Sequence, residues 1–558
     1  MTSARVPYAE LHAHTAFSFL DGANQPEELA AQAARLELDA LAITDHDGLY
    51  GVVRFAQAAR HLGLPTVIGA ELSLNQRTPT TATMDPDADH LLVLTRGPEG
   101  YHRLSRAIAS AHLATGAKGE RDYGRGVGLD PLEVLAEAAD GNWLILTGCR
   151  KGTVRRALAD QGESAARSEL ERLVSLFGKD NVAVEITGQA RPEDSRRNDA
   201  LVEIARSVGL PVVATGAVHA ATPRDGHLAD ALAAIRARAS LDAIDGWLPP
   251  HPAILRSGRD MMQRHHRHPQ AVLTAARLGL ECAFDLRLVA PNLPPYPVPE
   301  GHTEDTWLVE LTMRGARERY GPPENPRHPQ AYATIARELE LILRLNFSGY
   351  FLIVHEIVDF CRSQGILCQG RGSAANSAVC YAIGITAVDA VQHKLLFERF
   401  LSDGRSGPPD IDLDIEARRR EEVIQFVYQR YGREYAAQVA NVISYRPRSA
   451  VRDAARAFGY DVGQQDAWSK GLERWGSLRA GGPTKPWWQG ELNAPREKGV
   501  DSHDPTPPPQ TPPSARETAE IPDHVLDIAE QLLKLPRHLG IHSGGMVMCD
   551  RPVIEVCP

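Results

Sequence analysis

The sequence predicts an α/β protein with two regions: a seven-stranded, closed or nearly closed βα barrel, then a second α/β region. In the first half of the 558-residue chain, short apolar runs alternate with amphipathic stretches. This alternation is typical of βαβ units in a parallel sheet, and a barrel is the economical way to bury such a sheet. Residues 250–300 are rich in His, Arg and Pro and look like a connector, and the second region begins near Pro299.

The elements follow one another regularly. The predicted strands are Tyr8–Ala13, Ala40–Thr44, Thr66–Leu72, His90–Thr95, Trp143–Thr147, Val182–Thr187 and Pro211–Thr215. The amphipathic stretches predicted as helices are Pro26–Leu36, Val52–Leu62, Pro98–Leu113, Ser164–Phe177 and Pro192–Val208. In the second region we expect a helix from about His328 to Leu345 and another over Tyr350–Phe360.

The composition is that of an ordinary globular chain, with 43% apolar and 24% charged residues. A net charge of -10 argues against a uniformly basic nucleic-acid binder, but nine arginines fall within 418–456. Such a run is typical of a solvated helix face, although its position just after an aspartate strand favours a DNA surface. Residues 481–515 are rich in Pro and Gly and are predicted to be disordered or a surface insertion, where Trp487 and Trp488 could stack on bases.

The seven scattered cysteines form no CxxC pair, so they indicate neither a disulfide framework nor a zinc ribbon. No apolar run reaches the ~18 residues of a membrane span, and no signal peptide is recognisable. We therefore expect no membrane association and a reducing cytoplasm.

Metal-ligand side chains recur near the ends of the predicted strands. They are His12, His14, Asp21, His46, Glu71, His90, Cys149 and His219. One rim of a βα barrel gathers such residues into a single site, and imidazole with carboxylate suits Zn, Mn or Fe. A single histidine is more often a core or capping residue, but His-x-His at one strand end with Thr-Asp-His at the next favours a metal site. His90 fits least well because it precedes its strand.

The second region carries two motifs that suit phosphoryl transfer. Residues 409–414 (PDIDLD) predict a strand whose aspartates share one face, with neighbouring carboxylates roughly 6.5–7 Å apart at the backbone. That spacing suits two divalent cations about 3.5–4 Å apart. Residues 370–377 (GRGSAANS) offer N–H groups and hydroxyls to a polyphosphate at the start of a helix. Together they indicate a nucleotidyltransferase.

These residues carry a resemblance to a known family. Residues 12–22 (HAHTAFSFLDG), 43–51 (ITDHDGLYG) and 69–71 (GAE) resemble the polymerase-and-histidinol-phosphatase (PHP) domain. Residues 345–354 (LNFSGYFLIV), 370–377, 396–402 (LFERFLS) and 409–416 resemble the palm of the bacterial DNA polymerase III alpha subunit. The GRGSAANS segment and residues 538–552 (HLGIHSGGMVMCDRP) look more like its error-prone, translesion branch.

The resemblance implies a domain order. It is a PHP-type distorted (βα)7 barrel with connector (1–285), a polymerase beta-like palm (286–443), a mostly helical thumb with the Pro/Gly-rich insertion (444–520), and a truncated return to the palm (521–558). It also implies roles in the second region. Asp412 and Asp414 would hold catalytic Mg²⁺, and the nucleotide-binding positions are Arg371, Gly372, Ser373, Ser377 and Arg399. The thumb arginines Arg446, Arg448 and Arg452 would grip DNA.

In the barrel, the resemblance assigns the eight residues of the predicted cluster to Zn²⁺ or Mn²⁺, a site that some members use for proofreading. The implied partners are template-primer DNA and dNTPs, with a sliding clamp and mutagenesis accessory proteins possible in the full-length protein.

Two departures bear on activity. The family's last metal motif is usually Asp-x-His, whereas this chain has Ala217-Val218-His219, so one carboxylate ligand is missing. The chain also stops at Pro558, before the family's third catalytic aspartate, and we expect an N-terminal portion of the polymerase. Two alternatives remain: a metal-dependent phosphoesterase or 3′-5′ exonuclease that uses the barrel site, and a non-catalytic truncated product that only binds DNA.

Overall fold

The computed structural model describes residues 5–75, 88–115, 120–124, 128–244, 248, 253–289, 291–402, 409, 411–472, 478 and 521–558. The predicted insertion at 481–515, with Trp487 and Trp488, lies outside these residues.

The first region is a seven-stranded sheet whose strands lie side by side in chain order. They are β1 (Ala9–Glu10), β2 (Ala40–Ile43), β3 (Thr66–Leu74), β4 (Asp89–Thr95), β5 (Trp143–Leu146), β6 (Val182–Thr187) and β7 (Val212–Thr215). Just beyond β1 and β7, Ala13 and Val218 form a parallel bridge, and the N–H of His14 donates to the carbonyl of Val218 at 2.8 Å. The two sheet edges therefore meet, which confirms the predicted, nearly closed barrel.

The prediction of an all-parallel sheet was wrong at one strand. β4 runs antiparallel to both β3 and β5, whereas the other neighbouring pairs are parallel. An antiparallel neighbour needs no helical crossover, and the sequence between β3 and β4 carries no amphipathic helix pattern. The reversal moves the start of β4 to the rim where the other strands end.

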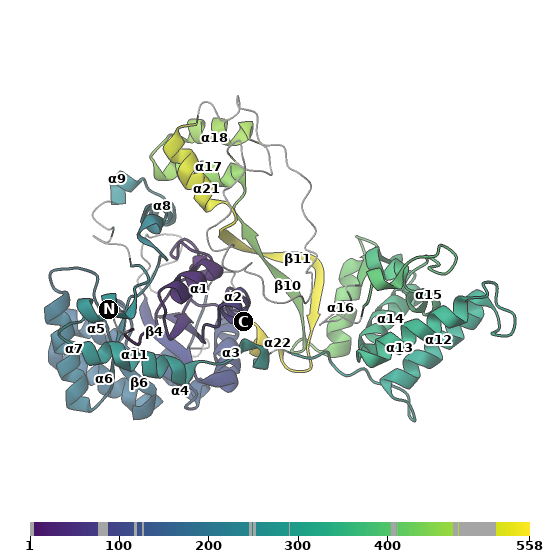
Figure 1. Cartoon of the computed structure of the whole chain (residues 1–558), viewed down its shortest axis with the longest axis horizontal. Helices are drawn as coiled ribbons and strands as arrows, with labels where there is room; N and C mark the ends of the chain where they lie inside the picture. Colours follow the sequence, from purple (N-terminus) through teal and green to yellow (C-terminus); the bar gives the residue numbers. More distant parts are fainter. Residues whose placement is uncertain are drawn as a thin grey trace.

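Helices cover the outside of the barrel. They are α1 (Pro26–Arg35), α2 (Val52–Leu62), α3 (Gly97–Thr115), α4 (Pro131–Ala139), α5 (Thr153–Asp160), α6 (Glu163–Phe177), α7 (Asp194–Val208), α10 (Gly258–Arg264) and α11 (Pro269–Cys282). Helices α8 (Gly226–Ala237) and α9 (Leu241–Ile244) follow β7 but stand away from the barrel (Figure 1). Local chemistry sets their ends: α1 starts with Pro26 in its first turn and a capping box between Gln25 and Glu28. Helix α11 packs on β1 and β7 across the sheet closure. A Cβ at its Gly279 would lie 2.5 Å from the Cβ of Ala9, so only glycine permits this approach.

The second region has its own hydrophobic core, which includes Leu308, Ile335, Phe351 and Phe400. Its elements are α12 (Glu304–Tyr320), α13 (Ala331–Arg344), α14 (Ser348–Ser363), β8 (Cys368–Arg371), α15 (Ala378–Ala382), β9 (Asp412–Ile415) and α16 (Arg420–Tyr431). Helices α13 and α14 confirm the two helices predicted here. No single described helix is long and apolar enough to cross a membrane; α13 and α14 meet that test only as a pair bent by 115°.

A long antiparallel ribbon, β10 (Ala436–Ser444) with β11 (Pro536–Met548), runs between the helices of the second region and the barrel (Figure 1). Beyond its other end, α17 (Pro447–Ala457), α18 (Val462–Gly471) and α21 (Asp523–Leu532) pack together, and α17 and α21 also contact α8. The last helix, α22 (Val553–Val556), returns to the barrel, where the Tyr101 hydroxyl donates to the Val556 carbonyl at 2.8 Å.

Candidate metal centre and palm motifs

The barrel rim brings the eight predicted ligand residues together, and four of the histidines face one carboxylate, Glu71 of β3. Its nearest histidine nitrogens are His90 Nδ1 at 3.1 Å, His14 Nε2 at 3.4 Å, His46 Nδ1 at 3.5 Å and His12 Nε2 at 3.8 Å. His90, the weakest fit by sequence, belongs to this cluster because β4 is reversed. Its first residues therefore lie at the rim, and His90 pairs in register with Ser73, two residues after Glu71.

In three of the histidines, the Nδ1 atom is hydrogen-bonded to a group outside the cluster. His12 Nδ1 lies 2.8 Å from Glu185 Oε1, His14 Nδ1 lies 3.1 Å from Ser18 Oγ, and His219 Nδ1 lies 2.8 Å from the Ala217 carbonyl. These acceptors favour a proton on the outer nitrogen, so the lone pair of Nε2 faces inward. Metal-binding histidines are oriented by outer partners of this kind.

Sequence reasoning missed these supporting side chains. Glu185 lies inside β6 and Asp45 follows β2, where it accepts a 2.6 Å hydrogen bond from Ser18 Oγ. One signal was available for Glu185, which is a carboxylate in the otherwise apolar run VAVEIT. Asp45 belongs to the Thr-Asp-His motif, but the sequence analysis predicted only its neighbour His46 as a ligand.

The donor set fits a metal ion. Among the described residues, Glu71 Oε1 and His46 Nδ1 are buried without a hydrogen-bond partner. The Nε2 atoms of His12 and His14 face each other at 3.2 Å, a separation that a shared cation relieves. Three overlapping groups place their ligand atoms within 4.8 Å of one another: His12, His14 and Glu71; His14, Asp21 and His46; and His46, Glu71 and His90. Nitrogen and carboxylate donors suit Zn²⁺ or Mn²⁺.

The electrostatics also favour positive charge here. Burial lowers the pKa of His12, but the carboxylates of Glu185 and Glu71 outweigh it and raise that pKa to about 10. Burial would raise the pKa of Glu71, yet His90 and His14 hold it well below its usual range. Cys149 Sγ lies 3.5 Å from His90 Nδ1, beside the cluster, and burial raises the pKa of its thiol to about 12.

The cluster opens into a cavity of about 630 Å³. Its wall is rich in cationic side chains, which are Arg121, Arg150, Lys151, Arg155, Arg191, Arg236 and Arg238. Burial, followed by the charge of Arg197, lowers the pKa of Arg155 to about 10. A cationic wall around a metal centre suits a phosphate ester or a nucleic-acid end.

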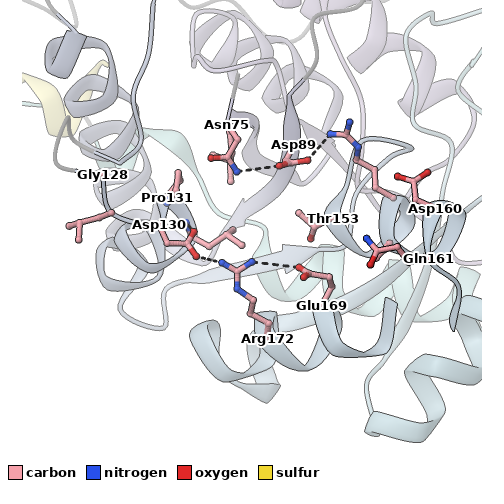
Figure 2. Close-up of a pocket in the computed structure, with 15 residues that line it drawn as sticks. Asn75, Asp89, Gly128, Asp130, Pro131, Thr153, Asp160, Gln161, Glu169 and Arg172 are labelled. Atoms are coloured by element: carbon pink, nitrogen blue, oxygen red, sulfur yellow. Dashed lines mark hydrogen bonds and ion pairs between the residues drawn. The ribbon is translucent and has the colours of Figure 1, made fainter. Parts of the chain in front are cut away.

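A second, charged cavity of about 700 Å³ is lined by residues of β4, α5 and α6, among others (Figure 2). Arg156 of α5 donates to Asp89 Oδ1 at 2.6 Å and to the Ala88 carbonyl at 3.1 Å. On the opposite wall, Arg172 forms ion pairs with Asp130 and Glu169. Asp89 directly precedes His90, so the Arg156 contacts fix the start of β4 and the backbone of a candidate ligand.

The two palm motifs lie side by side as antiparallel strands. β8 pairs with β9 so that Arg371 faces Asp412 and Gln369 faces Asp414. Both aspartate side chains are exposed, at 54% and 66%. Arg371 Nε lies 3.0 Å from Asp414 Oδ1, and Nη2 lies 3.8 Å from Asp412 Oδ2. Two accessible carboxylates on one strand face fit Mg²⁺, which is commonly held by one or two carboxylates plus substrate phosphates.

The other predicted nucleotide-binding residues differ in exposure. Gly372, at φ +65°, would place a Cβ 3.9 Å from Asp412 Oδ2. Ser373 is half-buried and Arg399 is exposed. Ser377 is fully buried, and its hydroxyl donates to Glu338 Oε2 at 2.9 Å. The exposed part of the loop, next to the aspartates, is therefore Arg371 and Gly372.

The predicted DNA-binding arginines lie at the start of α17 and along it. Arg446 and Arg448 are exposed, and Arg448 Nε donates to the Leu472 carbonyl at 2.8 Å. Arg452 is paired with Asp466 at 2.8 Å. Their role in DNA binding stays a prediction.

Comparison with known families follows this division of the chain. The PHP domain family matches residues 10–189, and the bacterial DNA polymerase III alpha NTPase domain matches residues 306–558. The two regions therefore match the two domain families that the sequence resembles, which confirms that resemblance.

Curated relatives that this chain matches are named error-prone DNA polymerase. That of Mycolicibacterium paratuberculosis is 57% identical over 99% of this chain and 47% of its own length. That of Mycobacterium tuberculosis is 56% identical over 99% of this chain and 46% of its own. That of Nocardia farcinica is 53% identical over 99% of this chain and 48% of its own. The chain spans about half the length of the curated relatives it matches.

Proposed function

We propose that the chain acts as the PHP and palm portion of an error-prone DNA-directed DNA polymerase. The observation that carries the proposal is the pairing of β8 with β9, which puts the glycine-serine loop beside Asp412 and Asp414. Bound Mg²⁺ would supply charge neutralisation and activation of the primer 3′-hydroxyl. Asp412 and Asp414 would hold it, while Gly372 and Ser373 orient the triphosphate through backbone N–H groups.

The proposal extends to substrates and surroundings. Template-primer DNA and dNTPs would be the substrates, with Arg446, Arg448 and Arg452 contacting the DNA backbone without reading sequence. We also propose the domain boundaries expected from the sequence, which are 1–285, 286–443, 444–520 and 521–558. A role in damage tolerance in the cytoplasm, with a sliding clamp and mutagenesis accessory proteins, belongs to the same proposal and rests on the family resemblance of the sequence. The name of the relatives supports only the error-prone polymerase part.

Primer extension tests the polymerase proposal. The 558-residue chain is compared with the double variant Asp412→Asn/Asp414→Asn, in Mg²⁺ with all four dNTPs. The matched control is Glu421→Gln, an exposed acid on the neighbouring helix α16. Extension that the double variant loses and the control retains supports the proposal. Extension that survives the double variant would exclude these aspartates from catalysis.

A second function is favoured by the barrel site: metal-dependent hydrolysis of a phosphate ester or a DNA 3′ end. The observation that favours it is the histidine–Glu71 cluster inside a cationic cavity. Hydrolysis of p-nitrophenyl phosphate and of a 3′-labelled oligonucleotide, in Mn²⁺ or Zn²⁺, is measured for two variants. The activity should be lost in His14→Ala and kept in Asp412→Asn/Asp414→Asn, whereas the reverse pattern would assign it to the palm.

A further inference from the structure

Asp21 forms an ion pair with an arginine, whereas Glu71, the other carboxylate of the cluster, faces histidines. Asp21 Oδ2 faces His46 Nε2 at 2.9 Å and His219 Nε2 at 3.3 Å, and its other oxygen, Oδ1, forms an ion pair with Arg236 of α8. The carboxylate is therefore already paired with a cationic side chain of this chain.

Among the described residues, Asp21 is the one acidic side chain that forms an ion pair with Arg236. Arg236 lines the same cavity as the metal-ligand cluster, its side chain is 32% exposed, and its Nε is buried without a hydrogen-bond partner among the described residues. Ala217 lines the same cavity and contributes a methyl group instead of a ligand atom. At this end of the cluster, Asp21 is the carboxylate that Arg236, His46 and His219 share.

We propose that the guanidinium of Arg236 takes the place of a divalent cation at the group His14, Asp21 and His46. A divalent cation at Asp21 would lie across one carboxylate from the guanidinium, in a half-buried site where the repulsion is screened less than in bulk water. In the other two groups, His12–His14–Glu71 and His46–Glu71–His90, no lysine or arginine of the described residues forms an ion pair with the carboxylate. The barrel therefore binds at most two ions, and Arg236 sets that number.

The inference rests on the metal centre of the second proposed function, and metal stoichiometry tests it without reference to activity. The 558-residue chain is loaded with Mn²⁺ or Zn²⁺, desalted, and measured by inductively coupled plasma mass spectrometry. Wild type should hold no more than two ions in the barrel, and Arg236→Gln should hold one more. The matched control is Arg238→Gln, because Arg238 lines the same cavity but is not the ion-pair partner of Asp21. Palm ions are removed from the count by using the Asp412→Asn/Asp414→Asn background throughout.

Two further variants keep the test sharp. Arg236→Lys preserves the charge and should keep the wild-type count, which excludes a loss of packing as the cause of any gain. Asp21→Asn/Arg236→Gln should lose the added ion, because the carboxylate is gone. Three ions on wild type, or an unchanged count in a folded Arg236→Gln, would overturn the inference and leave the metal centre standing. No barrel ion on any variant would overturn the metal centre itself, and the inference with it.

Discussion

The hydroxyl of Ser377 and the carboxylate of Glu338 are joined by a 2.9 Å hydrogen bond inside the second region. The backbone N–H groups of Ala378 and Val379 donate to the same carboxylate at 3.1 and 3.0 Å. Glu338 is 1% exposed and Ser377 is fully buried. The N–H groups in the first turn of α15, which have no partner within the helix, are therefore hydrogen-bonded to a glutamate of this chain. They directly follow the loop that is proposed to hold the triphosphate.

This contact predicts a pH dependence of stability. Burial raises the pKa of Glu338 to about 7, against the lowering effect of its hydrogen bonds. The folded chain then keeps a proton that the unfolded chain releases near pH 4.5, so the stabilisation is present at low pH and lost as pH rises through about 7. From pH 5 to 8, wild type should lose up to about 3 kcal/mol of unfolding free energy that Glu338→Gln does not lose.

Urea unfolding at several pH values measures this difference. The control is Glu340→Gln, an exposed glutamate on the same helix, which should follow the wild-type slope. Equal slopes for wild type and Glu338→Gln would show that Glu338 does not carry the proton.

Glu338 also shows what the sequence could not reveal. The helical pattern over α13 was recognisable, but a glutamate on its buried face looks like one on its exposed face until its partners in α15 are known. The same limit applied to β4. Its apolar run predicted a strand, yet strand direction depends on which neighbours it pairs with, and His90 could be placed at the rim only after that. By contrast, the ligands at strand ends, such as His12 and His46, were predictable because strand ends of a barrel share one rim.

Metal loading of the barrel should raise its stability. An ion at a hundred times its Kd stabilises the folded state by about 2.7 kcal/mol if it does not bind the unfolded chain. Glu71→Gln should lose most of this gain because Glu71 faces four histidines of the cluster. The measurement is thermal unfolding with EDTA and with Mn²⁺ or Zn²⁺. Glu203→Gln, an exposed acid on α7, should keep the full metal-dependent shift; an equal shift in Glu71→Gln would remove Glu71 from the site.

We expect Arg156 to affect the metal affinity of the barrel site without contacting the ligand side chains. Its contacts with Asp89 and the Ala88 carbonyl hold the start of β4, and outer contacts of this kind commonly change metal affinity by 10- to 100-fold. We expect Arg156→Gln to weaken Mn²⁺ or Zn²⁺ binding about tenfold in calorimetric titration. Arg172→Gln provides the control, since Arg172 lines the same cavity but pairs with Asp130 and Glu169 instead of β4. Equal weakening by both variants would point to a general change of the cavity.

The crossing of α12 and α15 should tolerate no side chain at Gly315. A Cβ there would lie 1.9 Å from the Ala382 carbonyl oxygen, a backbone atom that cannot rotate away. Overpacking of this kind costs about 1–3 kcal/mol, so Gly315→Ala should lower the free energy of unfolding by that amount.

Gly471→Ala is the matched control, because a Cβ at Gly471 meets nothing within 4 Å at the end of α18. Since alanine favours helix over glycine by about 1 kcal/mol, the control should be neutral or slightly stabilised. Denaturant unfolding compares the two, and because α12 lies far from the barrel (Figure 1), metal binding should be unchanged in both. A stable Gly315→Ala would mean that the two helices can separate, and the core that supports β8 would then be less rigid than this contact implies.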